Sequence, residues 1–180
     1  MQTTIMFCLV ALVLLVFSMT LWSKRPPALP PVDVRETIDI NIPVRAVFDE
    51  WTEFERYPHF IEGVKEVEVI DHWHMRWKTE LNSREMEFDT KMDEQIPDKS
   101  LAWTSHTTPA HTVALRFARL SANRTRLTVE IQIAGNGDAM DGLHTAEQVR
   151  AHVAKTLRKC KQLLEERGRG YSYSSVRRRP

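Results

Sequence analysis

The sequence predicts an α+β domain in which a curved antiparallel sheet wraps around one long C-terminal helix. From about Val64, apolar residues recur at every second position for about seventy residues, which is typical of successive strands with one buried face. From about Asp141 to Arg167 they recur at every third or fourth position, which predicts a helix of about seven turns with one apolar side. The chain has 180 residues, which is enough for one such domain and too few for two.

The segment that precedes this domain is strongly apolar. Ile5 to Trp22 contains no charged residue, and as a helix it would reach about 27 Å, close to the roughly 30 Å of a bilayer core. Lys24 and Arg25 follow, and the positive-inside rule places them in the cytoplasm. A cleaved signal peptide is the alternative, but Met1 to Thr4 contain no Lys or Arg and no small-x-small cleavage site follows. We therefore predict one transmembrane helix in residues 1–25 and a cytoplasmic domain.

A stiff linker and a first strand and helix come next. Prolines fill much of residues 26–31, and the domain is predicted to occupy residues 32–167. Alternating apolar positions predict a strand with Val34, Ile38, Ile40 and Ile42 on its buried face. Pro43 suits the first turn of a short helix, which Tyr57-Pro58 would end. The apolar side of that helix contains Val44, Val47, Phe48 and Trp51.

An aromatic stripe continues from this helix. Trp51, Phe54, Tyr57 and Phe60 recur at three-residue spacing, with Gly63 as the next break. Such a stripe is most often plain core. Its position between the first strand and the long series of strands also suits a lid over an apolar cavity, and both interpretations stay open.

Five runs of alternating residues make up most of the predicted sheet. Their inward positions are Trp73, Met75, Trp77, Thr79 and Leu81; Met86, Phe88, Thr90 and Met92; Leu101, Trp103 and Ser105; Val113, Leu115 and Phe117; and Leu127, Val129, Ile131 and Ile133. Short polar turns between the runs predict antiparallel pairing, and the one-sided alternation predicts a wet outer face. The helix that follows has Val149, Val153 and Leu157 on its apolar side. We expect Gly168 and Gly170 to end it, leaving residues 168–180 as a basic, disordered tail.

The charges are unevenly distributed along the chain. Residues 32–166 contain all 24 acidic residues and 18 of the 25 basic ones, a net charge of −6, while the remaining seven basic residues lie in the flanks. An acidic domain argues against nucleic acid as its target, because phosphate binding needs a basic face on the fold itself. Basic flanks suit anionic lipid headgroups, or they are simply solvated ends. The sequence identifies no protein partner.

Several motifs in this order resemble the START-like superfamily, and within it the polyketide cyclase/dehydrase group that includes coenzyme Q-binding START domains. They are Phe48-Asp49-Glu50-Trp51, Tyr57-Pro58-His59-Phe60-Ile61-Glu62-Gly63-Val64, Pro97-Asp98-Lys99-Ser100-Leu101-Ala102-Trp103, Thr125-Arg126-Leu127-Thr128-Val129 and Lys161-Gln162-Leu163-Leu164-Glu165. The similarity spans about Val32 to Glu166. It implies a helix-grip fold with a deep apolar cavity that binds a lipid, a quinone or a polyketide.

Three functions follow as hypotheses. The favoured one is a non-enzymatic, membrane-tethered carrier or binding module for a hydrophobic small molecule. Its ligand would contact the entrance residues Trp51, Phe54, Tyr57 and Phe60, the sheet residues Trp73, Trp77, Phe88, Trp103 and Phe117, and the helix residues Val149, Val153 and Leu157. The alternatives are a cyclase or dehydratase that uses the same cavity and a structural partner protein at the membrane. No nucleophile motif, phosphate loop or metal-ligand set is evident, so we predict no catalytic residue, cofactor or metal.

Overall fold

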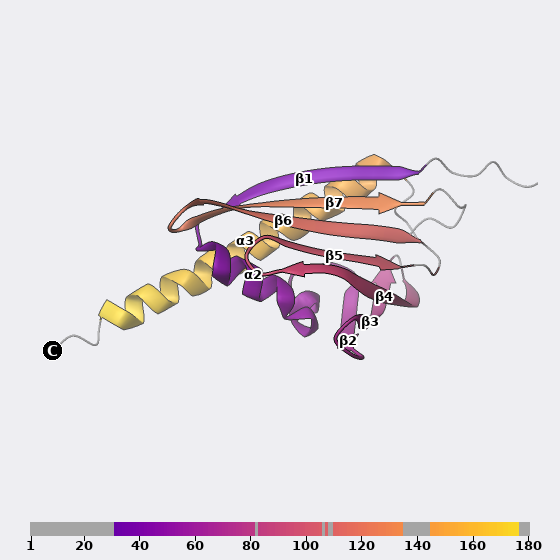
Figure 1. The fold of residues 1–180 in the computed structure, drawn as a ribbon, viewed down its shortest axis with the longest axis horizontal. Coiled ribbons are helices and arrows are strands. Elements are labelled where there is room, and N and C mark those ends of the chain that lie inside the picture. The colour runs from indigo at the N-terminus through magenta and orange to yellow at the C-terminus, as the bar shows by residue number, and fades with distance from the viewer. Residues whose placement is uncertain (1–30, 82, 106, 108–109, 135–144, 177–180) are drawn as a thin grey trace, which may run out of the picture.

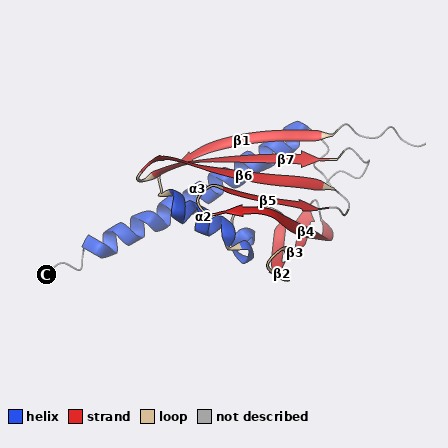
Figure 2. Ribbon diagram, viewed as in Figure 1, coloured by secondary structure: helices blue, strands red, loops and turns tan. Residues whose placement is uncertain are grey.

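One antiparallel sheet and one long helix dominate the computed structural model of the protein, which describes residues 31–176 except 82, 106, 108–109 and 135–144. The elements are β1 (Val32–Ile40), α2 (Val44–Thr52), the 3-10 helix η1 (Phe54–His59), β2 (Val64–Val69), β3 (His74–Leu81), β4 (Arg84–Ile96), β5 (Ser100–Ser105), β6 (His111–Ser121), β7 (Arg124–Ile133) and α3 (Ala146–Val176). The seven strands pair in the order β1-β7-β6-β5-β4-β3-β2. Helix α3 crosses one face of this sheet (Figures 1 and 2), so the predicted curved sheet around a C-terminal helix is confirmed.

The sheet is bent rather than flat. Its pairing register shifts between Val64 and Glu66, between Met92 and Glu94, and between Arg119 and Ser121. Each such bulge adds a residue to one strand and increases the local twist. Figure 1 shows the result, because β2 and β3 turn away from the direction shared by β1, β7 and β6. The bent sheet encloses space on the side that α3 covers.

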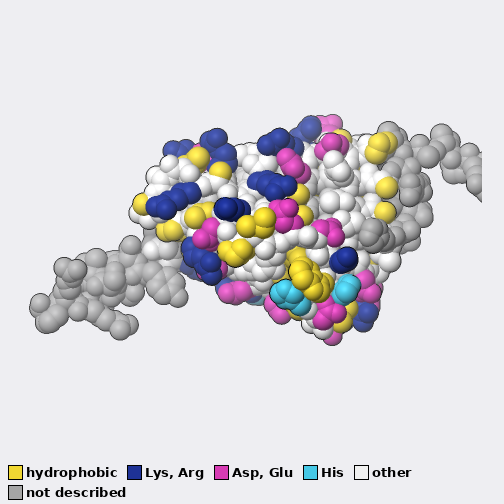
Figure 3. All heavy atoms as spheres, in the orientation of Figure 1, with side chains coloured by type: hydrophobic (Ala, Val, Ile, Leu, Met, Phe, Trp, Pro, Cys, Tyr) yellow, Lys and Arg dark blue, Asp and Glu magenta, His cyan; other side chains and the backbone are white. Residues whose placement is uncertain are grey.

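The outer face of the sheet is exposed to solvent and contains both acidic and basic side chains. Ion pairs join neighbouring strands across it, including Arg126 with Asp39 at 2.8 Å and Arg76 with Asp89 at 3.0 Å. Figure 3 shows basic and acidic side chains interspersed over the face that looks away from α3. As predicted from the alternation in β4 and β7, the apolar residues of these strands face inward and the charged residues face outward.

Two short-range expectations differ from the structure. Pro58 lies inside η1 and does not end a helix, because a 3-10 turn this short tolerates a residue without an N–H. Helix α3 continues through Gly168 and Gly170 to Val176, although a tail was expected from residue 168. Gly168 permits a close approach at this point, since a Cβ there would lie 2.5 Å from Ile42 Cδ1.

The predicted localisation, a single-pass membrane protein with a cytoplasmic domain, is contradicted. Among the helices that the structure describes, none is both long enough and apolar enough to span a bilayer. Helix α3 has the length, with 31 residues, but charged residues recur along it. The segment Ile5–Trp22, on which the prediction rested, lies outside the described residues. We therefore take neither a membrane anchor nor a membrane partner into the functional argument.

Candidate functional site

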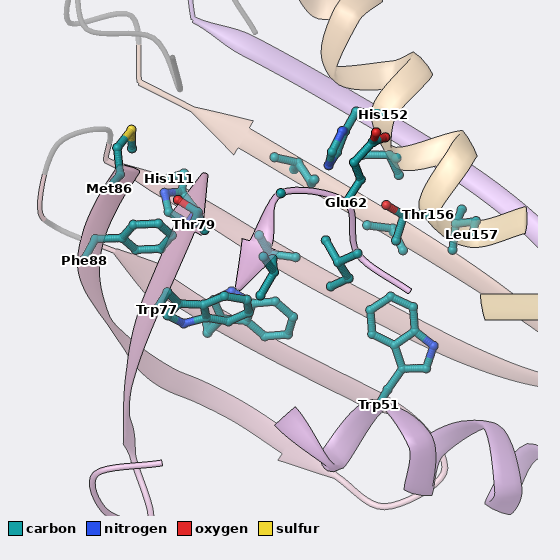
Figure 4. Close-up of a pocket in the computed structure, with 18 residues that line it drawn as sticks. Trp51, Glu62, Trp77, Thr79, Met86, Phe88, His111, His152, Thr156 and Leu157 are labelled. Carbon is teal, nitrogen blue, oxygen red and sulfur yellow. The ribbon is translucent and has the colours of Figure 1, made fainter. Parts of the chain in front are cut away.

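An apolar cavity lies between the concave side of the sheet and α3. Its volume is about 150 Å³, and Figure 4 shows the 18 residues that line it. They come from α2, the segment before β2, the first residue of β2, strands β3 to β7 and α3: Trp51, Ile61, Glu62, Gly63, Val64, Trp77, Thr79, Met86, Phe88, Trp103, His111, Val113, Val129, Ile131, His152, Val153, Thr156 and Leu157. An engineered cavity of about this size in another protein stays dry and binds benzene. The space therefore suits one aromatic ring.

Aromatic side chains from three adjacent strands form one wall of the cavity. Trp77 and Phe88 are directly opposite each other in the β3–β4 pairing, and their rings stack at 6.1 Å with an interplanar angle of 6°. On its other side Trp77 stacks on Trp103 of β5 at 5.9 Å. The Trp77 indole N–H donates a hydrogen bond of 2.8 Å to Thr90 Oγ1, which is itself buried. This bond fixes the orientation of the central indole, which is part of the cavity lining.

Helices α2 and α3 supply the facing wall. Trp51 is the last large apolar residue of α2, and Val153 and Leu157 lie one turn apart on α3. All three are buried. Figure 4 shows Trp51 and Leu157 on the side of the cavity nearer the helices, with Trp77 and Phe88 across from them. A planar apolar molecule would lie between these two walls.

The structure brings half of the predicted site residues to the cavity. Those that line it are Trp51, Trp77, Phe88, Trp103, Val153 and Leu157. Phe54, Tyr57, Phe117 and Val149 are buried elsewhere in the core, whereas Phe60, also buried, lines a neighbouring groove that is described below. The Tyr57 hydroxyl donates a 2.8 Å hydrogen bond to the Trp51 carbonyl, and the Tyr57 ring packs 5.6 Å from that of Trp77. Phe54 and Tyr57 thus pack in the core next to the wall and do not border the cavity.

Trp73 lies outside both the cavity and the core, with 49% of its surface exposed. Strand β3 begins only at His74, and the Asp71 carboxylate accepts hydrogen bonds from the backbone N–H groups of Trp73 and His74 at 2.7 and 2.9 Å. This capped turn interrupts the alternation one residue before the strand starts. We therefore remove Trp73 from the predicted binding residues.

The lining residues that sequence reasoning missed fall into three groups: inward apolar positions of the strands, the segment before β2, and four polar residues described in the next two paragraphs, Thr79, His111, His152 and Thr156. Met86, Val113, Val129 and Ile131 belong to predicted inward faces, but the alternation alone does not reveal which inward positions border empty space. The segment from Ile61 to Val64 was missed because it is irregular. Gly63 has φ of 82°, a left-handed conformation that glycine adopts without strain, and this turns the chain over the cavity before β2.

Polar groups gather at the end of the cavity where this segment meets α3. Glu62 pairs with Lys155 at 2.7 Å, and the Lys155 ammonium lowers the pKa of the Glu62 carboxyl. Burial lowers the pKa of His152 below its usual range, although the Glu62 carboxylate opposes this effect. Figure 4 shows Glu62, His152 and Thr156 together on the α3 side. His152 is thus neutral at pH 7 and can accept a proton or a hydrogen bond.

Further polar features lie at the other end of the cavity and outside it. His111 is buried on β6, with its ring edge-on to Phe88 at 5.3 Å, and Thr79 lies beside it. A groove of about 630 Å³ adjoins the segment that contains Glu62, and its lining includes Lys155 and Lys159. Cavity and groove share the segment from Ile61 to Val64 and Thr156. A ligand larger than one ring would have this groove as its nearest additional space.

Comparisons with known proteins agree with this geometry. The profile of the family described as polyketide cyclase / dehydrase and lipid transport matches residues 40–154. A 17.2 kDa protein of Streptomyces lincolnensis is 29% identical over 136 residues, which cover 75% of this chain and 91% of that protein.

Solved structures show the same fold. The Zhui aromatase/cyclase of Streptomyces sp. R1128 superimposes with a TM-score of 0.61 at 17% identity, over 77% of this chain and 96% of that chain. A START superfamily protein of Mycobacterium smegmatis gives a TM-score of 0.60 at 14% identity, over 75% of this chain and 95% of that one. The resemblance predicted from the sequence motifs is therefore confirmed, and the chain belongs to the polyketide cyclase / dehydrase and lipid transport family.

Proposed function

We propose that this protein binds a compact hydrophobic molecule, or the apolar ring of a larger one, in the cavity between the sheet and α3. The observation that carries the proposal is the cavity itself, which is walled by Trp51, Trp77 and Trp103 and holds about 150 Å³. Ligand sites are typically concave and mostly apolar, with few polar groups that fix orientation. The polar side chains here are confined to the two ends, which leaves the middle to aromatic and aliphatic contacts.

The five tryptophans provide a direct test. In a 1H–15N NMR titration with toluene, the indole N–H signals of Trp51, Trp77 and Trp103 should shift, because these rings line the cavity. The signal of Trp73, which is half exposed and outside the cavity, is the internal control and should stay in place. Shifts at Trp73 equal to those of the three lining indoles, or no shifts at all, would contradict the proposal.

A second candidate function is proton-transfer catalysis in the same cavity, as an aromatase or cyclase would perform. The arrangement that favours it is a neutral His152 beside the Glu62 carboxylate, since a neutral imidazole can take a proton from a bound substrate. General acid–base catalysis of this kind contributes about 10²- to 10⁴-fold in rate.

A poly-β-ketone model compound distinguishes the two candidates. Enzymatic cyclisation that is lost in His152→Gln while toluene binding is retained would establish the enzyme. Cyclisation at the uncatalysed rate with the wild-type protein would leave binding as the function.

A further inference from the structure

Thr156 is a buried polar residue that lines the cavity and has no hydrogen-bond partner in the described part of the chain. Its side chain is 7% exposed, and its hydroxyl makes no hydrogen bond to any group that the structure describes. Burying a hydroxyl in this condition costs about 1–3 kcal/mol in proteins. Such atoms are rare in native structures and call for an explanation.

Three other buried side-chain atoms in the described residues also lack a hydrogen bond, but each of them faces a polar group. Glu50 Oε1 lies 3.2 Å from Arg56, and Asp98 Oδ1 lies 3.7 Å from Arg45. The Trp51 indole N–H is directed to the Cys160 thiol closely enough to lower the pKa of that thiol, although the two make no hydrogen bond. Thr156 differs from all three because no charged or thiol group among the described residues compensates for the burial of its hydroxyl.

The position of Thr156 in the cavity defines what kind of molecule could satisfy it. It lies one turn after His152 on α3, at the polar end that also contains Glu62 (Figure 4). The stacked rings of Trp77, Phe88 and Trp103 form the opposite wall. A molecule seated against those rings would have one edge directed at α3. A hydroxyl both donates and accepts, so an oxygen of either kind on that edge could pair with Thr156.

We propose that the Thr156 hydroxyl determines specificity, selecting an aromatic ring that carries a hydroxyl or carbonyl oxygen over the corresponding hydrocarbon. The inference rests on the proposed binding function and adds the chemical class of the ligand. Phenol and toluene are nearly the same size and differ in a hydroxyl against a methyl group. They are therefore the probes for this contact.

The test is the ratio of phenol to toluene affinity, measured by isothermal titration calorimetry. Thr156→Val replaces the hydroxyl by a methyl group of similar volume and should weaken phenol binding about three- to tenfold, with toluene affinity unchanged. Thr156→Ser keeps the hydroxyl and should keep the phenol preference. Without ligand, Thr156→Val should melt at the same temperature as the wild type or higher, because an unsatisfied hydroxyl has been removed.

Thr125→Val is the matched control. The Thr125 hydroxyl donates a 2.8 Å hydrogen bond to the Ile42 carbonyl and does not line the cavity, so its loss should lower the melting temperature and leave the affinity ratio unchanged. Three results would overturn the inference: an unchanged ratio in Thr156→Val, an equal loss for both probes, or the same change in Thr125→Val. If toluene and phenol both fail to bind the wild type, the proposed function fails first and the inference fails with it.

Discussion

Placing a larger side chain at two positions on the same face of α3 tests whether the cavity is empty space. Val153 lines the cavity, whereas Val149, one turn earlier, is buried in closed core. Both valines are almost fully buried, with exposures of 5% and 2% respectively. The same substitution by Phe should therefore be tolerated at Val153 and should destabilise the protein at Val149.

The expected magnitudes follow from the available volume. The cavity of about 150 Å³ corresponds to roughly five water molecules at about 30 Å³ each. Phe has four more carbon atoms than Val, and each buried CH₂-sized group contributes about 0.8 kcal/mol, which sets an upper limit of about 3 kcal/mol. Imperfect fit reduces the gain, so Val153→Phe should raise the free energy of unfolding by about 1 kcal/mol or leave it unchanged. Val149→Phe has no space to fill and should cost about 1–3 kcal/mol through overpacking.

Urea denaturation followed by tryptophan fluorescence measures both free energies of unfolding, and equal m-values would show that the two variants unfold from comparable native states. Calorimetric titration with toluene supplies the functional measurement. Val153→Phe should no longer bind toluene, and Val149→Phe should still bind it. The reasoning is refuted if Val153→Phe is destabilised as much as Val149→Phe, or if it binds toluene like the wild type.

Three further predictions concern titratable groups that are partly or fully buried. The pKa of His152 is lowered in the native protein from 6.5. Near and below that pH the unfolded chain therefore binds a proton that the native protein does not, and the free energy of unfolding should fall as the pH drops below about 6.5. Urea titrations at several pH values should show a smaller fall in His152→Gln than in the wild type. Burial, reinforced by Glu50, raises the pKa of Cys160 to about 12, so peptide mapping after iodoacetamide treatment at pH 8 should find this thiol unmodified until the protein unfolds. Glu50→Ala removes contacts of 3.2 Å to Arg56 and 2.7 Å to Arg167. It should lower the free energy of unfolding by about 1–3 kcal/mol, which is less than the loss of a fully buried ion pair because both arginines are partly exposed. An unchanged midpoint of urea denaturation would contradict this prediction.

The sequence was sufficient to predict the parts of the fold that have a regular period. Alternation in β4 to β7 identified inward residues such as Phe88 and Leu115, and the three-to-four spacing identified Val153 and Leu157 on α3, because burial on one side imposes these periods. The family resemblance carried the same information in its motifs. These hydrophobic periods follow from burial in one common core, and local irregularities of the chain do not remove them.

Local geometry could not be predicted in the same way. The Asp71 cap that moves Trp73 to the surface depends on two hydrogen bonds, and the close approach of Gly168 to Ile42 depends on how α3 packs. The cavity is a still harder case. Whether an inward residue such as Tyr57 packs against others or borders empty space is decided by the bend of the sheet, and hydrophobic periodicity contains no signal for it.

The central claim is that the space between the sheet and α3 receives an aromatic ligand. The most direct measurement is a crystal structure of the protein soaked with iodobenzene, in which anomalous scattering locates the iodine. The account predicts an iodine peak within the cavity, with the rings of Trp77 and Trp103 on one side of it and the side chain of Leu157 on the other. A peak confined to other sites, with the cavity closed around its own side chains, would contradict it.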